Sequence, residues 1–271
     1  MASTHATGVD LDDEVGKPYP KPTYKNATHV IFDLDGIILD TEPIYDDCFR
    51  ATAEHFGKKL PDEVLLKTKG RQPNDCFNTI IDGLKLKCKT EEFGKHFETM
   101  AKDKCLKAKL MPGIERIAKH LYFHQVPLAV ATSNEKPWFD MLAKNHFLFF
   151  TLIHHVVCGG SDPEVKHGKP APDIFLVAAS RFKDKPSPSK CLVFEDSHNG
   201  VLAAVAAGMQ VVMLPEKITP PEQRKGATQV LRHLYRFRPE AYGWPEFKDD
   251  PLDGTEWDSS DEEEPFKWPP V

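Results

Sequence analysis

The sequence predicts an α/β protein, in which a parallel sheet carries helices on both faces and a small helical domain is inserted after the first strand. Two observations predict this fold. Beyond residue 110, helical patterns alternate with short apolar runs rich in β-branched residues, which is typical of a parallel sheet covered on both faces. Residues 43–109, in contrast, follow the first such run and contain little strand signal. The expected architecture is therefore Rossmann-like, with a helical insertion.

Hydrophobic periodicity locates the elements in chain order. The first strand is expected at 28–32, where a short apolar run stops at polar residues. The helices of the insertion are expected at 43–56, 61–68, 74–85 and 90–109. The helices of the sheet region are expected at 113–124, 136–146, 172–182 and 199–207. They alternate with strands expected at 127–131, 191–194 and 210–214. One further strand is expected at the end of the apolar stretch that closes at 158.

Composition sets the expected domain limits. Residues 1–27 are polar and contain prolines at 18, 20 and 22, so we expect a flexible arm. Residues 240–271 are rich in proline, tryptophan and acid, and we expect a disordered tail. The α/β core then consists of 28–42 together with 110–239, and 43–109 forms a helical cap.

Charge and composition exclude several classes of partner. The net charge of −6 comes from the tail, because residues 246–271 hold ten acids and two lysines and leave the other 245 residues at +2. A near-neutral core has no basic face for a nucleic acid polymer. No apolar run approaches the ~18 residues of a membrane span, and the N-terminus lacks the apolar stretch of a secretory signal. The six cysteines form no C-x-x-C pair, which favours reduced thiols. We expect a cytoplasmic monomer whose partner is a small molecule.

Polar side chains follow four of the expected strands. In open parallel sheets, ligands bind beyond the carboxyl ends of the strands, so residues at these positions are expected to share one site. Four carboxylates, a hydroxyl and a lysine meet this condition: Asp33 and Asp35, Thr132 with Ser133 and Asn134, Lys169, and Glu195 and Asp196.

Gathered carboxylates repel one another unless a cation lies among them, and hard oxygen ligands favour Mg²⁺. A bound Mg²⁺ attracts phosphate. Asp33 can then attack phosphorus as a nucleophile, and Asp35 can protonate the leaving oxygen and later activate water. The D-x-D triplet alone is weak evidence, since another, Asp10-x-Asp12, lies in the expected arm. The triplet at Asp33 differs because an apolar strand precedes it and Gly36 follows.

The other candidates each have a structural alternative. The Thr132 hydroxyl and the N–H groups after it can hold phosphoryl oxygens, or Thr132 can cap the next helix. Lys169 can neutralise Asp33 and a phosphate together, or it can be a solvated surface lysine. Glu195 and Asp196 can complete the metal site, or they can form an acidic pair at a helix N-terminus.

Four segments resemble the motifs of the haloacid dehalogenase superfamily in order and spacing: FDLDGIILDTE (32–42), ATSN (131–134), GKPAPDIF (168–175) and VFEDSHNG (193–200). The resemblance implies a Mg²⁺-dependent enzyme with a helical cap. The second acid, Asp35, argues for phosphoryl transfer and against dehalogenation. By motif, the resemblance implies a nucleophile at Asp33 and an acid/base at Asp35. It implies phosphate binding by Thr132, Ser133, Asn134 and Lys169. It also implies metal binding by Asp33, by the main-chain carbonyl of Asp35, and by Glu195 and Asp196.

The substrate depends on the cap, where the resemblance is weaker. Arg71 lies between two expected cap helices and is a candidate substrate contact, although an exposed arginine is the simple alternative. We expect a phosphatase of a small phosphomonoester, most of all a nucleotide-like monophosphate. The alternatives are a phosphatase of glycerol 3-phosphate or another small phosphometabolite, a phosphomutase, and a non-catalytic scaffold that retains the fold.

Overall fold

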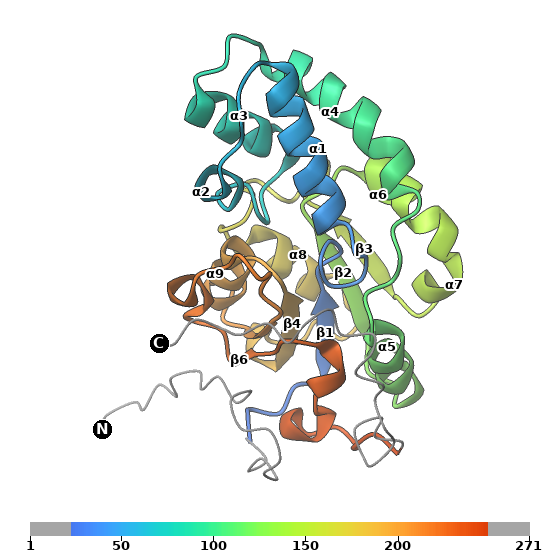
Figure 1. The fold of residues 1–271 in the computed structure, drawn as a ribbon. Helices are drawn as coiled ribbons and strands as arrows, with labels where there is room; N and C mark the ends of the chain where they lie inside the picture. Colours follow the sequence, from blue (N-terminus) through green and yellow to red (C-terminus); the bar gives the residue numbers. More distant parts are fainter. Residues whose placement is uncertain (1–22, 249–271) are drawn as a thin grey trace, which may run out of the picture.

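The structure, a computed structural model, describes residues 23–248 and contains a parallel sheet with helices on both faces (Figure 1). The strand order is β3-β2-β1-β4-β5-β6, and every paired neighbour is parallel. The strands are β1 (His29–Phe32), β2 (Leu128–Thr132), β3 (His155–Cys158), β4 (Cys191–Glu195), β5 (Gln210–Met213) and β6 (Gln229–Val230). The predicted fold class and the first five strands are confirmed. The sixth has two residues, which is too short for a periodic pattern.

Nine α-helices lie in the described residues: α1 (Glu42–His55), α2 (Asp62–Leu65), α3 (Pro73–Leu84), α4 (Thr90–Cys105), α5 (Ile114–Phe123), α6 (Lys136–Ala143), α7 (Phe147–Phe150), α8 (Asp173–Ser180) and α9 (His198–Ala206). α2 is shorter than expected. α7 was not expected as a separate helix, because a run of four apolar residues has no period that separates a helix from a strand. Within the described chain, each helix is too short or too polar to cross a lipid bilayer.

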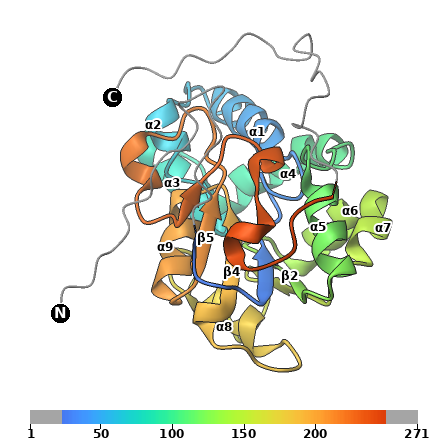
Figure 2. The ribbon, with the colours of Figure 1, turned by 90° about the horizontal axis from the view of Figure 1, so that it is seen from below.

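Alternate strand residues face two different apolar clusters, because successive side chains point to opposite sides of a sheet. Val30 and Phe32 of β1 pack in the cluster that contains the apolar residues of α5, α6 and α7. Ile31, between them, packs in the cluster formed with α8 and α9. Figure 2 shows α5–α7 on one side of the strands and α8 and α9 away from them. Burial on both faces explains why these strands are apolar runs without alternation.

Helices α1–α4 come between β1 and β2 in the chain and lie beyond the carboxyl ends of the strands (Figure 1). They pack around phenylalanine rings: Phe49 of α1 stacks on Phe97 of α4 with ring centroids 4.4 Å apart. Phe77 of α3 lies 5.8 Å from Phe93 of α4. The inserted helices therefore have an apolar interior and stand over the edge of the sheet where the predicted site lies.

The packed chain extends beyond the limits of 28 and 239 expected from composition. The Tyr24 N–H donates to the Ala241 carbonyl at 2.9 Å, and the Tyr24 ring stacks on Tyr242 with centroids 4.9 Å apart. Tyr242 is fully buried. Aromatic burial therefore fixes residues 23–27 and 239–244 against the sheet, although the composition of the surrounding sequence predicted an arm and a tail there. The rest of the expected arm and tail, residues 1–22 and 249–271, lies outside the described part of the chain.

Candidate active site

The register of the sheet brings the first acid of the triplet beside the acid that ends β4. Phe32 pairs with Phe194 on one side and with Val130 on the other, so Asp33 is a neighbour of Glu195 and of the end of β2. Asp33 and Asp196 are each 5% exposed, and Glu195 is fully buried. The structure thus gathers these predicted residues at the carboxyl edge of the sheet.

Lys169 reaches the same edge from the loop that follows β3. Its Nζ donates to Asp33 Oδ1 at 2.5 Å and also contacts Glu195 Oε1. The side chain is 1% exposed, which rules out the solvated surface lysine. Burial lowers the pKa of Lys169, but the charges of Asp33 and Glu195 outweigh burial and raise the pKa above its ordinary value. Lys169 is therefore a buried ammonium held between two carboxylates.

The buried Glu195 depends on the turn that follows β4. Its Oε2 accepts hydrogen bonds from the Ser197 hydroxyl at 3.0 Å and the Ser197 N–H at 3.3 Å. A Cβ on Gly200 would lie 1.9 Å from the Glu195 carboxyl carbon, so a side chain there would displace the acid. Ser197 also caps α9 by accepting from the Gly200 N–H at 3.0 Å. Sequence reasoning missed both residues, although both stand inside the VFEDSHNG segment.

Asp35 accepts hydrogen bonds from two different segments. The Thr41 hydroxyl donates to Oδ1 at 2.6 Å, and the Asn134 amide donates to Oδ2 at 2.7 Å. Burial and then the charge of Glu42 raise the pKa of Asp35 to about 6, although hydrogen bonds from Thr41, Tyr45 and Asn134 oppose the shift. A carboxyl group in this range can hold or release a proton near neutral pH. Thr41 and Tyr45 were not singled out in the sequence.

Residues 132–134, at the end of β2, have different hydrogen-bond partners. Thr132 is fully buried, and its hydroxyl accepts from the Asn134 N–H at 3.2 Å. α6 begins at Lys136 with Glu135 as its N-cap, so the alternative in which Thr132 caps the helix is wrong. The Ser133 hydroxyl donates to the Gly70 carbonyl of the insertion at 2.9 Å. These residues therefore lie between the sheet edge and the inserted helices.

The carboxylates fit a hard cation. Burial raises the pKa of Asp33 well above its ordinary value, with Lys169 opposing, and burial with the charges of neighbouring acids does the same for Asp196. A Cβ on Gly36 would lie 2.5 Å from Asp196 Oδ2, so only glycine leaves this oxygen room. A divalent cation among such acids would relieve their repulsion, and carboxylate and carbonyl oxygens are the donors that Mg²⁺ prefers.

A cavity of about 270 Å³ joins the sheet edge to the inserted helices. Asp33, Asp35 and Asp196 line it on the sheet side, and phenylalanine rings line it on the helical side. Arg71 also lines this cavity, and its buried Nε has no hydrogen-bond partner in the described structure. The sequence-predicted Arg71 therefore faces the same space as the predicted acids.

The loop between α2 and α3 closes the cavity against the core. The Asn199 amide donates to the Lys69 carbonyl at 2.7 Å, and the Gln72 amide donates to the Gly159 carbonyl at 2.6 Å. A Cβ on Gly70 would lie 2.2 Å from the Ser197 hydroxyl oxygen, and its φ of +72° lies in the left-handed region that favours glycine. The loop from 68 to 72 thus lies directly on the residues that hold Glu195.

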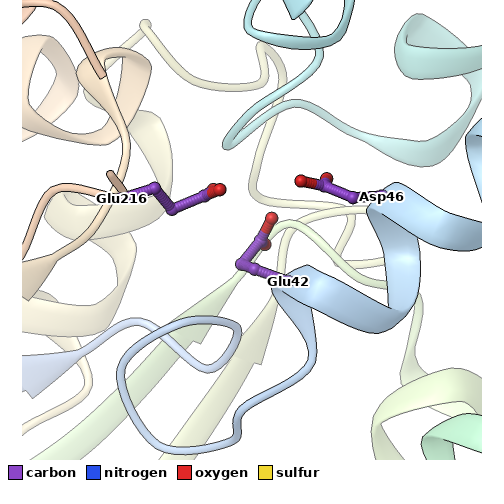
Figure 3. A group of neighbouring side chains, drawn as sticks. All are labelled: Glu42, Asp46 and Glu216. Atoms are coloured by element: carbon purple, nitrogen blue, oxygen red, sulfur yellow. The ribbon is translucent and has the colours of Figure 1, made fainter. Parts of the chain in front are cut away.

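A second group of acids surrounds Lys69. Figure 3 shows Glu42 and Asp46 of α1 and Glu216 of the loop after β5 pointing toward one another. The Lys69 Nζ lies within 2.5 Å of Glu42, 2.6 Å of Asp46 and 2.8 Å of Glu216. An ammonium therefore holds the centre of this group, so it is an ionic contact between insertion and core and not the candidate magnesium site.

The chain belongs to the haloacid dehalogenase-like hydrolase family, whose model matches residues 30–214. This match confirms the resemblance of the four motifs. The phosphatase names of its relatives and the presence of the second acid, Asp35, define the enzyme class as a phosphoric monoester hydrolase.

Two relatives are nearly equally similar to this chain. A Drosophila melanogaster protein named "Probable pseudouridine-5'-phosphatase" is 43% identical over 225 residues, which cover 83% of this chain and 97% of the fly protein. An Arabidopsis thaliana protein named "(DL)-glycerol-3-phosphatase 2" is 42% identical over 227 residues, which cover 83% of this chain and 94% of the plant protein. A β-phosphoglucomutase structure from Clostridium difficile matches with a TM-score of 0.66 at 21% identity, covering 80% of this chain and 97% of that one. At that identity the match shows the fold alone.

The ionic group around Lys69 predicts a pH-dependent stability. Burial and the charge of Glu42 raise the pKa of Glu216 to about 7, with Lys69 opposing. Because this pKa is raised on folding, the folded state keeps a proton that the unfolded chain has lost, and stability falls as the pH rises from about 4.5 to about 7. Urea denaturation should show the free energy of unfolding falling by about 1–2 kcal/mol more for the wild type than for Glu216→Gln between about pH 5 and pH 8.

The exposed neighbour Glu222 provides the control, and Glu222→Gln should follow the wild type. Identical pH dependences for the wild type and Glu216→Gln would contradict the burial and charge assigned to this group.

Proposed function

We propose that this enzyme is a Mg²⁺-dependent phosphatase that converts pseudouridine 5'-phosphate to pseudouridine and phosphate through an aspartyl-phosphate on Asp33. One observation carries the proposal: Asp33, paired with the buried Lys169, and Asp35, hydrogen-bonded by Thr41 and Asn134, line one end of a single cavity. This arrangement supports two different carboxyl roles at one sheet edge.

The first half-reaction uses Asp33 as nucleophile and Asp35 as acid. A carboxylate oxygen of Asp33 attacks phosphorus, and the bond from phosphorus to the ester oxygen breaks. Asp35 donates its proton to that oxygen, so the leaving group departs as a neutral alcohol. Its pKa of about 6 supports this role, because a useful fraction of the carboxyl carries a proton near neutral pH.

The second half-reaction returns the enzyme to its starting state. Asp35, now ionised, takes a proton from water while the water oxygen attacks phosphorus. The bond between phosphorus and Asp33 breaks, and phosphate leaves. Since Asp35 gains the proton that it gave in the first step, protons balance over the cycle.

The remaining residues hold the phosphoryl group and the metal in this proposal. Thr132, Ser133, Asn134 and Lys169 would bind phosphoryl oxygens. Asp33, Asp196, Glu195 and the main-chain carbonyl of Asp35 would hold Mg²⁺. When bound, Mg²⁺ supplies positive charge that attracts the phosphate and offsets the charge developed during transfer. Glu195 Oε2 accepts from both the hydroxyl and the N–H of Ser197, whereas Oε1 accepts from Lys169 alone and retains a lone pair for a cation.

The choice of substrate rests on the relatives and on the cavity. The identities of 43% and 42% do not separate pseudouridine 5'-phosphate from glycerol 3-phosphate, which stays the second candidate. The rings on the helical side of the cavity favour a leaving group with an aromatic ring. The inserted helices act as a cap in this proposal, and the cytoplasmic location and monomeric state expected from the sequence stay predictions.

Replacing the nucleophile tests the mechanism. With Mg²⁺ present, the wild type should release phosphate from pseudouridine 5'-phosphate faster than from uridine 5'-phosphate, glycerol 3-phosphate or sugar phosphates. Asp33→Asn should lower this rate by a factor on the order of 10³ or more, because an amide is a poor nucleophile. The exposed acid Asp40 gives the matched control, and Asp40→Asn should keep the wild-type rate.

The panel also separates the alternatives. Preference for glycerol 3-phosphate would keep the mechanism and change the substrate. An isomerised sugar phosphate without free phosphate would identify a mutase, and no reaction with any ester would favour the scaffold.

Replacing Arg71 tests its proposed contact with the substrate. A charged hydrogen bond contributes about 1.5–3 kcal/mol, so Arg71→Ala should lower kcat/KM for the preferred ester about tenfold to a hundredfold. Lys67, an exposed cation of the same region, supplies the control, and Lys67→Ala should have no such effect. Unchanged kcat and KM in Arg71→Ala would show that the arginine only lies near the substrate.

A further inference from the structure

We infer that the helical side of the cavity is a subsite for a planar heterocyclic ring, and that Phe49, Phe77 and Phe97 select substrates that carry one. The inference rests on the proposed function and names the part of the substrate that the inserted helices recognise. It separates a nucleoside monophosphate from the phosphate of a polyol or a simple sugar.

Three phenylalanines from three different helices form the wall of this subsite. Phe49 belongs to α1, Phe77 to α3 and Phe97 to α4, and all three line the cavity. Phe49 and Phe97 stack with centroids 4.4 Å apart at an interplanar angle of 20°, and Phe77 lies 5.5 Å from Phe97. They are 8%, 4% and 6% exposed, so each ring is packed and still presents a small surface. Packed rings of this kind offer a rigid apolar face.

A fourth ring of the same cluster lies away from the cavity. Phe93, one turn earlier on α4, contacts Phe77 and Phe56 and is fully buried. It does not line the cavity among the residues described. Protein interiors are close-packed, so an open space beside packed rings is unusual. In this insertion the open space lies beside Phe49, Phe77 and Phe97, at the end that faces the sheet.

Two further rings complete the chamber, one from the core and one from the insertion. Trp138 of α6 and Tyr45 of α1 both line it, and the Trp138 indole N–H donates to the Tyr45 hydroxyl at 2.9 Å. This bond fixes one ring of the core against one ring of the insertion. The volume of about 270 Å³ is close to the lower limit of ~300 Å³ for pockets that hold drug-sized ligands.

Polar groups at the same cavity match the edge of a heterocycle. Arg71, whose buried Nε has no partner in the described structure, can donate to a ring carbonyl, and Asn74 can both donate and accept. A nucleobase has two apolar faces and a polar edge, which this combination of rings and donors fits. A glycerol or sugar group has no planar π surface to stack on the phenylalanine faces and carries hydroxyls that need polar partners.

The test compares two esters that differ by the base alone, pseudouridine 5'-phosphate and ribose 5-phosphate. The wild type should prefer the nucleotide in kcat/KM. Phe97→Leu should lower this preference about tenfold, chiefly through KM, since base stacking is lost while the phosphate site is intact. Phe93→Leu is the matched control, because the same change on the same helix removes a ring that does not line the cavity, and its preference should stay at the wild-type value. Phe49→Leu repeats the test if Phe97→Leu fails to fold.

Each outcome decides the inference. Equal losses with both esters in Phe97→Leu would assign the rings to packing and overturn it, as would a wild type with no preference for the nucleotide. Calorimetric titration with pseudouridine and with ribose measures the subsite without turnover, and pseudouridine alone should bind. Pseudouridine binding without phosphate release from any ester would reject the proposed function and keep the subsite. Phosphate release without pseudouridine binding would reject the subsite and keep the phosphatase.

Discussion

The buried ammonium of Lys169 ties the active-site edge of the sheet together. It lies between Asp33, which follows β1, and Glu195, which ends β4, and its Nζ is also 3.5 Å from the Ala131 carbonyl of β2. A carboxylate buried as deeply as Glu195 is costly without a paired charge. The lysine comes from the loop after β3, so this contact requires the central strands of the sheet to be in register. The same contact positions the carboxylate of Asp33. The turn that follows Asp33 then places Asp35 at the same end of the cavity.

Four carboxylates at this edge exceed the charge that Lys169 supplies. The acids differ in their surroundings: Asp33 has the ammonium, Asp35 accepts hydrogen bonds from Thr41 and Asn134 among others, and Asp196 lies beside Gly36. In the proposed mechanism, the ammonium beside Asp33 favours its ionised form for attack, and the surroundings of Asp35 allow it to exchange a proton near neutral pH. The excess of acid is also the physical reason for proposing a divalent cation here, whereas the acids around Lys69 already enclose an ammonium.

Local patterns carried most of the prediction of the sheet edge. Asp33-x-Asp35 with Gly36 follows one apolar run, and Thr132 follows another. Each short pattern predicts both the end of a strand and the polar side chains at that end. Contacts between distant segments were not predictable in this way. Gly200 is required because Glu195 fills the space of its side chain, and Lys69 meets Glu216 only after the insertion has docked on the core. The packing of Tyr24 on Tyr242 likewise joins two segments whose composition predicted an arm and a tail.

The inserted helices give this sheet edge its enclosure. Their loop from 68 to 72 is hydrogen-bonded to the segments after β2 and β3 and to α9. An enclosed site excludes water and strengthens the electrostatic interactions within it. The same helices supply the aromatic wall, so in the proposed function the chemistry comes from the sheet edge and the choice of leaving group from the insertion.

Trapping the covalent intermediate tests the central claim most directly. Acid quenching during turnover of pseudouridine 5'-phosphate with Mg²⁺, followed by mass spectrometry of the digested protein, should find one phosphoryl group on the peptide that contains Asp33 and none on that peptide from Asp33→Asn. A phosphoryl group on another residue, or steady phosphate release with no covalent adduct at any quench time, would contradict the account.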